Sequence, residues 1–179
     1  MLSLCCREKS IYKVPDIYMN KMLFIIRHGE AIASSSSDFN RTLTVYGKKQ
    51  VSDLAVRLAQ RIADLQVEHP GSGLFLVSPY VRAQQTAKIM GEKIHFPQQT
   101  FAAITPDDPV DVALNLMQAE LNSAPSYLIL VSHMPFVGDL FSMMTEGRVG
   151  VGRGFVTAEC VQLACSEYLP GCGIDKGIV

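Results

Sequence analysis

Three short apolar runs stand out along the chain: MLFII (22–26), LFLVS (74–78) and YLILVS (127–132). Each run has the length of a strand. Continuous rather than alternating hydrophobicity is typical of strands that are covered on both faces. The pattern therefore predicts a buried, mainly parallel sheet.

Between these runs, apolar residues recur at steps of three and four, as they do on one face of a helix. This spacing predicts a helix from about Tyr46 to Val67 and another from about Pro109 to Leu121. A further helix is expected after Ser78 and Pro79, with the serine as its cap and the proline in its first turn. Polar and glycine-containing segments separate these helices from the strands.

Strands that alternate with helices predict an α/β fold with a three-layer arrangement, in which helices cover both faces of a mostly parallel central sheet. The segment from Arg153 to Cys165 lacks helix caps and is expected to form an edge strand or a hairpin. We expect one domain over residues 22–165. A loose extension (1–21) would precede it, and a glycine-rich tail (166–179) would follow.

Composition narrows the class of protein. The chain has 179 residues and a formal net charge of −1, so no overall field would attract nucleic acid. No apolar run approaches the roughly 20 residues that cross a bilayer, and the N-terminal residues lack the apolar core of a signal peptide. Five cysteines without CxxC spacing fit neither a disulfide framework nor a zinc site. We expect a soluble, cytoplasmic protein with reduced thiols and with no nucleic-acid or membrane partner.

Cationic and imidazole side chains follow the predicted strands. Arg27 and His28 come after the first strand, Arg82 lies one helical turn after the second, and His133 comes after the third. In an open α/β sheet, residues just beyond the carboxyl ends of the strands share one crevice. Helix N-termini at the same edge also favour anions. Because guanidinium groups match phosphate oxygens, the pattern predicts a phosphate site.

The two histidines add nucleophilic chemistry to this site. A neutral imidazole can attack phosphorus in line and hold the phosphoryl group covalently, which splits one displacement into two. As metal ligands the histidines are poor candidates, because the neighbouring Arg27 and Arg82 would repel a cation. We therefore expect no metal and no cofactor.

Four segments carry a resemblance to a known family: RHGE at 27–30, LTVYGKKQ at 43–50, SPYVRAQQTA at 78–87 and SHMPFVG at 132–138. In order and spacing, the sequence resembles the histidine phosphatase (phosphoglycerate mutase-like) superfamily. Within it, the chain is most similar to the bacterial SixA-type phosphohistidine phosphatases. The resemblance covers about residues 22 to 145.

The resemblance implies a role for each matching residue. His28 would be the phosphorylated nucleophile, and Arg27, Arg82 and His133 would bind the transferring phosphoryl group and stabilise its oxygens. Arg41 matches an accessory arginine of the SixA-type members and would also contact substrate. Larger members of the superfamily contain inserted segments that cover the active site. In this chain only short connections separate the motifs, which implies that there is no large cap domain.

One segment departs from the pattern of the mutases and phosphomonoesterases. These members commonly carry a carboxylic acid after the RAxxT helix, but here that loop reads FAAITPDD, with Ala103 near the expected position. Asp107 and Asp108 are the remaining candidates for a general acid. An alkoxide leaving group needs such a donor. The imidazole of phosphohistidine does not, because its second ring nitrogen can carry the proton.

These features predict a metal-independent phosphatase that hydrolyses phosphohistidine on a signalling protein, such as a phosphotransfer domain, through phospho-His28. The alternative is a small-molecule phosphomonoesterase of the same superfamily, with Asp107 or Asp108 as the acid and a small phosphorylated substrate. A non-catalytic module that binds phosphoprotein is a third reading. The presence of all four residues that match the family's catalytic motifs argues against such a module. These are Arg27, His28, Arg82 and His133.

Overall fold

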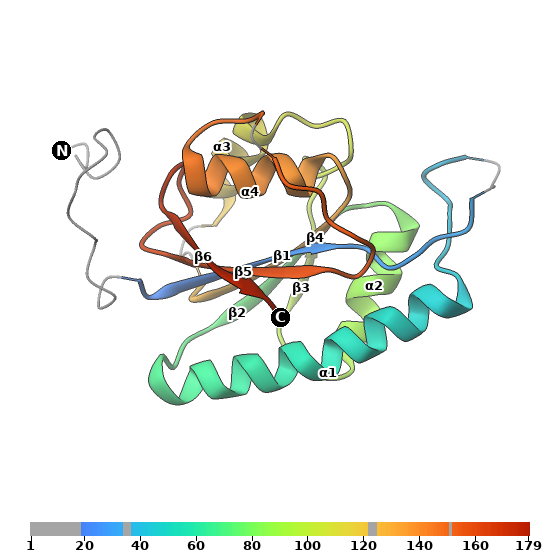
Figure 1. Ribbon diagram of the computed structural model, residues 1–179, viewed down its shortest axis with the longest axis horizontal. Coiled ribbons are helices and arrows are strands. Elements are labelled where there is room, and N and C mark those ends of the chain that lie inside the picture. Colours follow the sequence, from blue (N-terminus) through green and yellow to red (C-terminus); the bar gives the residue numbers. More distant parts are fainter. Residues whose placement is uncertain (1–18, 34–36, 122–124, 151) are drawn as a thin grey trace.

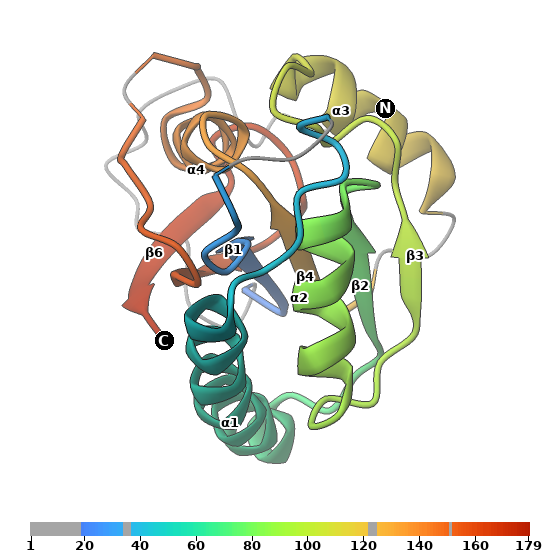
Figure 2. The same ribbon diagram turned by 90° about the vertical axis from the view of Figure 1, so that its right-hand side faces the viewer.

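The computed structural model describes residues 19–33, 37–121, 125–150 and 152–179, which form a layered α/β structure (Figures 1 and 2). In this part of the chain the sheet has six strands in the order β3-β2-β4-β1-β5-β6. The strands are β1 (Lys21–Arg27), β2 (Gly73–Val77), β3 (Gln98–Thr100), β4 (Tyr127–Ser132), β5 (Cys160–Cys165) and β6 (Gly173–Ile178). The helices of the same residues are α1 (Val45–Glu68), α2 (Val81–Gly91), α3 (Val110–Glu120) and α4 (Phe136–Glu146).

Helices cover both faces of the sheet, as predicted. Helices α1 and α2 pack on one face and α3 and α4 on the other (Figure 2). Two clusters of buried apolar side chains fill the spaces between the layers. Strand β4 is buried along its whole length because it lies between β2 and β1 and beneath both helical layers. Its continuous apolar sequence is therefore the consequence of burial on two faces. Over the described residues no large cap domain covers the sheet.

Strands β1 to β4 are parallel, and their register aligns the carboxyl ends of β1, β2 and β4. Strand β1 pairs with β4 from Met22 opposite Tyr127 to Arg27 opposite Ser132. Strand β2 pairs with β4 on its other side and ends at the same edge. Each of the three strands therefore delivers the residues that follow it to one edge of the sheet.

The C-terminal part of the chain differs from the sequence-based expectation. Strand β5 is an internal strand, antiparallel to β1, and it forms a hairpin-like pair with β6. Residues 173–178, which we expected in a tail, form β6 at the edge of the sheet. Most of β6 is exposed, so it lacks the apolar run that signals a buried strand. Its position comes from main-chain pairing, which leaves little trace in the sequence.

The cysteines that the structure describes, Cys160, Cys165 and Cys172, are buried and form no disulfide within the described residues. Burial raises the pKa of the Cys165 thiol to about 12 and that of Cys160 further still, so both favour the neutral thiol. They act as small apolar side chains of the core rather than as reactive groups.

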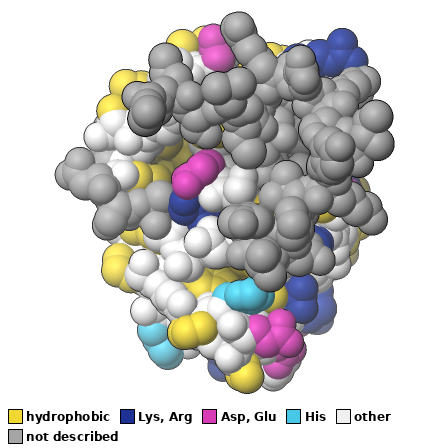
Figure 3. All heavy atoms as spheres, turned by 90° about the vertical axis from the view of Figure 1, so that its left-hand side faces the viewer, with side chains coloured by type: hydrophobic (Ala, Val, Ile, Leu, Met, Phe, Trp, Pro, Cys, Tyr) yellow, Lys and Arg dark blue, Asp and Glu magenta, His cyan; other side chains and the backbone are white. Residues whose placement is uncertain are grey.

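The surface carries charges of both signs. Viewed from the side in Figure 3, acidic, basic and hydrophobic side chains lie next to one another over the part of the surface that is described. This mixture agrees with the near-zero net charge of the sequence. Among the helices of the described ranges, none combines the length and the hydrophobicity needed to cross a membrane.

The first turn of α1 packs directly on the loop that follows β1. The Thr44 hydroxyl caps the helix by accepting from the Gly47 N–H (2.8 Å) and donates to the Glu30 carboxylate (2.8 Å). The Thr44 N–H also donates to the Glu30 carbonyl oxygen (2.9 Å). A Cβ atom at Gly47 would lie 2.0 Å from that carbonyl oxygen, so only glycine allows this approach.

We therefore expect Gly47→Ala to destabilise the protein. The added methyl group must push α1 away from the Glu30 loop, and overpacking of this kind costs about 1–3 kcal/mol of unfolding free energy. Urea unfolding would measure the loss. Gly154→Ala is the matched control, because a Cβ atom there meets open space and should change stability by less than about 0.5 kcal/mol. Equal effects of the two substitutions would contradict the packing argument.

Candidate active site

Two histidines meet at the edge of the sheet where β1 and β4 end. Because Arg27 pairs with Ser132, the next residues, His28 and His133, are neighbours. Their ring centroids lie 4.9 Å apart with an interplanar angle of 56°. The side chains come from loops more than a hundred positions apart in sequence, yet both are buried, with exposed fractions of 7% and 1%. The main-chain N–H of His28 donates to the Ser132 carbonyl (3.0 Å), which fixes the strand end.

The partners of the His28 ring determine its tautomer. Its Nδ1 atom lies 2.7 Å from the Gly29 carbonyl oxygen, which can only accept, so Nδ1 carries the proton. Its Nε2 atom accepts from the Nε–H of Arg82 at 3.1 Å, so Nε2 holds the lone pair. Desolvation, together with the charges of Arg82, Arg27 and Arg41, lowers the pKa of His28 to about 4. The ring is therefore a neutral imidazole whose unprotonated nitrogen faces Arg82.

Arg82 connects this ring to the loop after β1. Its Nη1 donates to the Asp38 carbonyl oxygen (2.6 Å), and its Nη2 forms an ion pair with the Asp38 carboxylate (2.9 Å). The guanidinium is buried, whereas Asp38 is mostly exposed. Among its five N–H donors, two therefore have no partner within the described structure. They are available to an anion at the mouth of the site.

Arg41 reaches the site through Asp38. Its Nη1 pairs with the other carboxylate oxygen of Asp38 (2.9 Å), and its Nε donates to the Ile32 carbonyl (2.6 Å). The hydrogen bond from Arg41, followed by that from Arg82, holds the pKa of Asp38 below its usual value. Asp38 thus links two guanidinium groups that the sequence analysis assigned to phosphate binding. Asp38 lies in a polar loop without a motif, so no sequence pattern pointed to this residue.

Arg27 and His133 present unpaired nitrogens in the same region. The Nη1 of Arg27 donates to the Phe155 carbonyl oxygen (2.6 Å), while its buried Nε has no hydrogen-bond partner in the described part of the chain. The same holds for Nδ1 of His133. Burial and the neighbouring Arg82 lower the pKa of Arg27, and desolvation followed by the charge of His28 lowers the pKa of His133. Buried polar atoms without partners are costly. An oxyanion would satisfy the Nε–H of Arg27, and it would also satisfy His133 in the tautomer that carries its proton on Nδ1 and accepts from the Ser78 hydroxyl at Nε2.

Two hydroxyl groups near Arg82, those of Ser78 and Thr86, make hydrogen bonds that the sequence did not predict. Ser78 was expected to cap α2, but the N-cap is Tyr80, without a side-chain hydrogen bond. The Ser78 hydroxyl instead lies 2.8 Å from Nε2 of His133. Thr86 accepts from the Gly29 N–H (3.2 Å) and donates to the Arg82 carbonyl (2.8 Å). These hydroxyl groups hold both histidine loops against α2.

The two candidate acids lie in the loop before α3. Asp108 accepts from the Thr105 N–H (2.6 Å), which folds the loop on itself, and Asp107 is exposed. Within the described residues, neither makes a hydrogen bond to His28 or His133. The structure thus brings Arg27, His28, Arg82 and His133 together and leaves both aspartates outside this cluster of contacts.

Comparisons with known proteins agree with this geometry. Residues 23–105 match the model of the histidine phosphatase superfamily (branch 1). The chain is 32% identical to the phosphohistidine phosphatase SixA homolog of Haemophilus influenzae over 130 residues, covering 70% of this chain and 78% of the relative. It is 29% identical to phosphohistidine phosphatase SixA of Escherichia coli over 128 residues, covering 70% of this chain and 75% of that protein.

A solved structure of the protein histidine phosphatase SixA complexed with tungstate superposes with a TM-score of 0.74 at 26% identity. The match covers 88% of this chain and 96% of the other. Arg27, His28 and Arg82 lie within the range of the family model, and the fold brings His133 to them from beyond it. On sequence and structure together, the chain belongs to the histidine phosphatase superfamily.

Proposed function

We propose that the protein is a phosphohistidine phosphatase that acts on a signalling protein through a covalent phospho-His28 intermediate. The observation that carries this proposal is the unprotonated Nε2 of His28, a buried nitrogen whose lone pair accepts from Arg82 in the structure and would turn to phosphorus when substrate is bound. The similarity to SixA proteins supports the choice of reaction. A phosphotransfer domain that carries its phosphoryl group on an exposed histidine fits as the partner.

In the first step, Nε2 of His28 attacks phosphorus in line, so the His28 N–P bond forms as the substrate N–P bond breaks. The electron pair of the broken bond leaves with the substrate imidazole, whose other nitrogen already carries a proton. The leaving group is therefore neutral. Water then attacks the phosphorus of phospho-His28, releasing phosphate and the free imidazole. The Gly29 carbonyl keeps the proton on Nδ1 and orients the ring throughout.

The cationic cluster stabilises the transferring group. In our proposal Arg27, Arg82 and His133 bind its equatorial oxygens, where charge is spread in the transition state. Arg41 acts from the rim, through its shared contact with Asp38. The positive charge comes from guanidinium groups, so we propose that the reaction needs no metal. No group of three histidine, cysteine or acidic side chains suited to a metal ion occurs in the described ranges.

The choice of phosphohistidine over a phosphate ester rests on the leaving group. Asp108 is engaged by the Thr105 N–H, and Asp107 is directed to solvent rather than bonded to the histidines. An alcohol departing as alkoxide needs a proton donor at its oxygen. A protonated imidazole needs none, and the short loops around the site leave room for a histidine presented on another protein.

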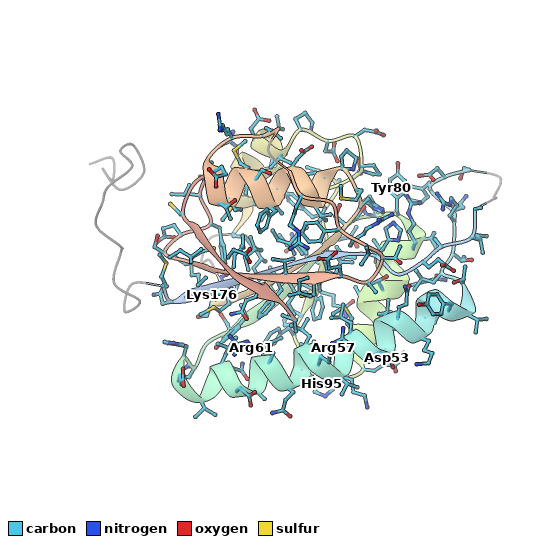
Figure 4. All side chains as sticks on the ribbon, viewed as in Figure 1. Asp53, Arg57, Arg61, Tyr80, His95 and Lys176 are labelled. Atoms are coloured by element: carbon cyan, nitrogen blue, oxygen red, sulfur yellow. The ribbon has the colours of Figure 1, made fainter. Side chains whose placement is uncertain are left out.

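We expect His28→Ala to lose turnover, because the nucleophile is removed, while the folded state is retained. Brief reaction of the wild-type protein with phosphohistidine, followed by mass spectrometry at alkaline pH, should find phosphate on His28. His95→Ala is the matched control, since that exposed histidine lies on the α1 side of the sheet, away from Tyr80 (Figure 4). Retained hydrolysis in His28→Ala would overturn the assignment. Binding of phosphoprotein without hydrolysis by the wild type would favour a non-catalytic module.

Substrate preference separates the phosphohistidine phosphatase from a phosphomonoesterase. Without a positioned acid, kcat/KM for a sugar phosphate should be about 100-fold or more below that for a phosphohistidine peptide. Both reactions can be followed by release of inorganic phosphate at neutral pH. If the sugar ester is preferred and Asp107→Asn or Asp108→Asn abolishes that activity, the alternative reading is correct.

The protonation of His28 can be measured directly. Since burial and neighbouring cations disfavour the charged ring, NMR titration should give a midpoint near pH 4 rather than the ordinary 6.5. The ring is then neutral and nucleophilic above about pH 5. Arg82→Gln removes one neighbouring charge and should raise the midpoint, though only in part, because burial is the larger cause. A wild-type midpoint near 6.5 would contradict this account.

A further inference from the structure

An aromatic row extends outward from the catalytic histidines. The Tyr80 ring lies 4.9 Å from the His133 ring, and the Phe39 ring lies 5.0 Å from the Tyr80 ring, both measured between centroids. Burial falls along the row: His133 is 1% exposed, Tyr80 is intermediate and Phe39 is 46% exposed. Figure 4 shows Tyr80 at the end of the molecule where α2 begins. The row therefore leads from the phosphoryl site to solvent.

The position of Phe39 is fixed by contacts with the start of α2. Its carbonyl oxygen accepts from the Val81 N–H (3.1 Å), and the preceding carbonyl, of Asp38, accepts from Arg82 (2.6 Å). The guanidinium carbon of Arg82 lies 4.8 Å from the centroid of the Tyr80 ring. The Tyr80 ring therefore contacts Arg82 in addition to the rings of Phe39 and His133. Phe39 thus directly follows Asp38, which accepts hydrogen bonds from Arg82, the proposed phosphate-binding residue.

A half-exposed phenylalanine at this place is not explained by packing of the core. The Phe39 side chain belongs to neither apolar cluster of the sheet, and its ring contact is with Tyr80. The mechanism above uses neither ring. A group joined to the transferring phosphoryl, however, must leave the site past the residues at its mouth, and Phe39 is the exposed member of the row.

We propose that Phe39, supported by Tyr80, is a specificity-determining residue on which the imidazole ring of the substrate phosphohistidine stacks. This inference rests on the proposed function and names how its leaving group is recognised. Aromatic faces attract planar rings and, more strongly, cationic ones. Stacking on Phe39 therefore favours the protonated imidazole, which is the form that departs as a neutral molecule. A sugar or glycerol leaving group has no such ring and gains nothing from this surface.

The test compares two substrates with the same phosphorus–nitrogen bond. Free phosphohistidine carries the imidazole ring, and phosphoramidate carries only an amino group. We expect Phe39→Leu to lower the ratio of kcat/KM for phosphohistidine to that for phosphoramidate by about three- to tenfold, the scale of one aromatic contact. Phe39→Tyr keeps the ring and should hold the ratio within about twofold of wild type. Val67→Ala, an exposed apolar residue near the end of α1, should leave the ratio unchanged.

The outcomes separate this inference from the proposed function. If wild type hydrolyses both substrates and Phe39→Leu lowers both kcat/KM values equally, Phe39 merely supports the loop, and the stacking role is wrong. An unchanged ratio with unchanged rates overturns it too. If wild type hydrolyses phosphoramidate but not phosphohistidine, the proposed function fails, and the stacking role fails with it. Circular dichroism and urea unfolding establish that each variant is folded before its rates are compared.

Discussion

The proposed chemistry of this protein depends on one hydrogen bond, from the Nε–H of Arg82 to Nε2 of His28. A guanidinium group can donate but cannot accept, and it does not lose its proton at ordinary pH. The imidazole nitrogen that faces it must therefore carry a lone pair. Burial reinforces this state, because it disfavours a charged ring beside other cations. A side chain that is usually half protonated near neutrality is thereby kept neutral, as the proposed nucleophile must be.

The sheet makes this contact possible. Parallel pairing of β1 with β4 sets His28 beside His133, and β2, on the other side of β4, leads into the helix that carries Arg82. Such a concentration of buried cationic and unpaired donor groups opposes folding, because each loses solvation. The exposed carboxylate of Asp38 offsets part of this cost by pairing with two guanidinium groups. The surrounding core supplies the rest of the free energy that holds the arrangement together.

Local sequence patterns were sufficient to predict much of this architecture. Burial on two faces produces continuous apolar strands, so β1, β2 and β4 could be identified, and with them the parallel sheet. Chemistry in such folds lies after the strand ends, so Arg27, His28, Arg82 and His133 could be grouped before any coordinates were considered. Their family motifs gave the same grouping. Strand β6 was missed because an exposed edge strand is held by main-chain hydrogen bonds, which leave little pattern in side-chain type.

The sequence by itself determined the layered fold and the residues that reach one edge of the sheet. Only the tertiary structure decided how their atoms are paired: Ser78 with His133 rather than as a helix cap, Asp38 between two arginines, and Phe39 at the outer end of an aromatic row. The reason is physical. Burial and backbone geometry repeat along a strand or helix and so appear in sequence spacing. The direction of a side-chain hydrogen bond depends on loop conformation, which is set by contacts between segments distant in the chain.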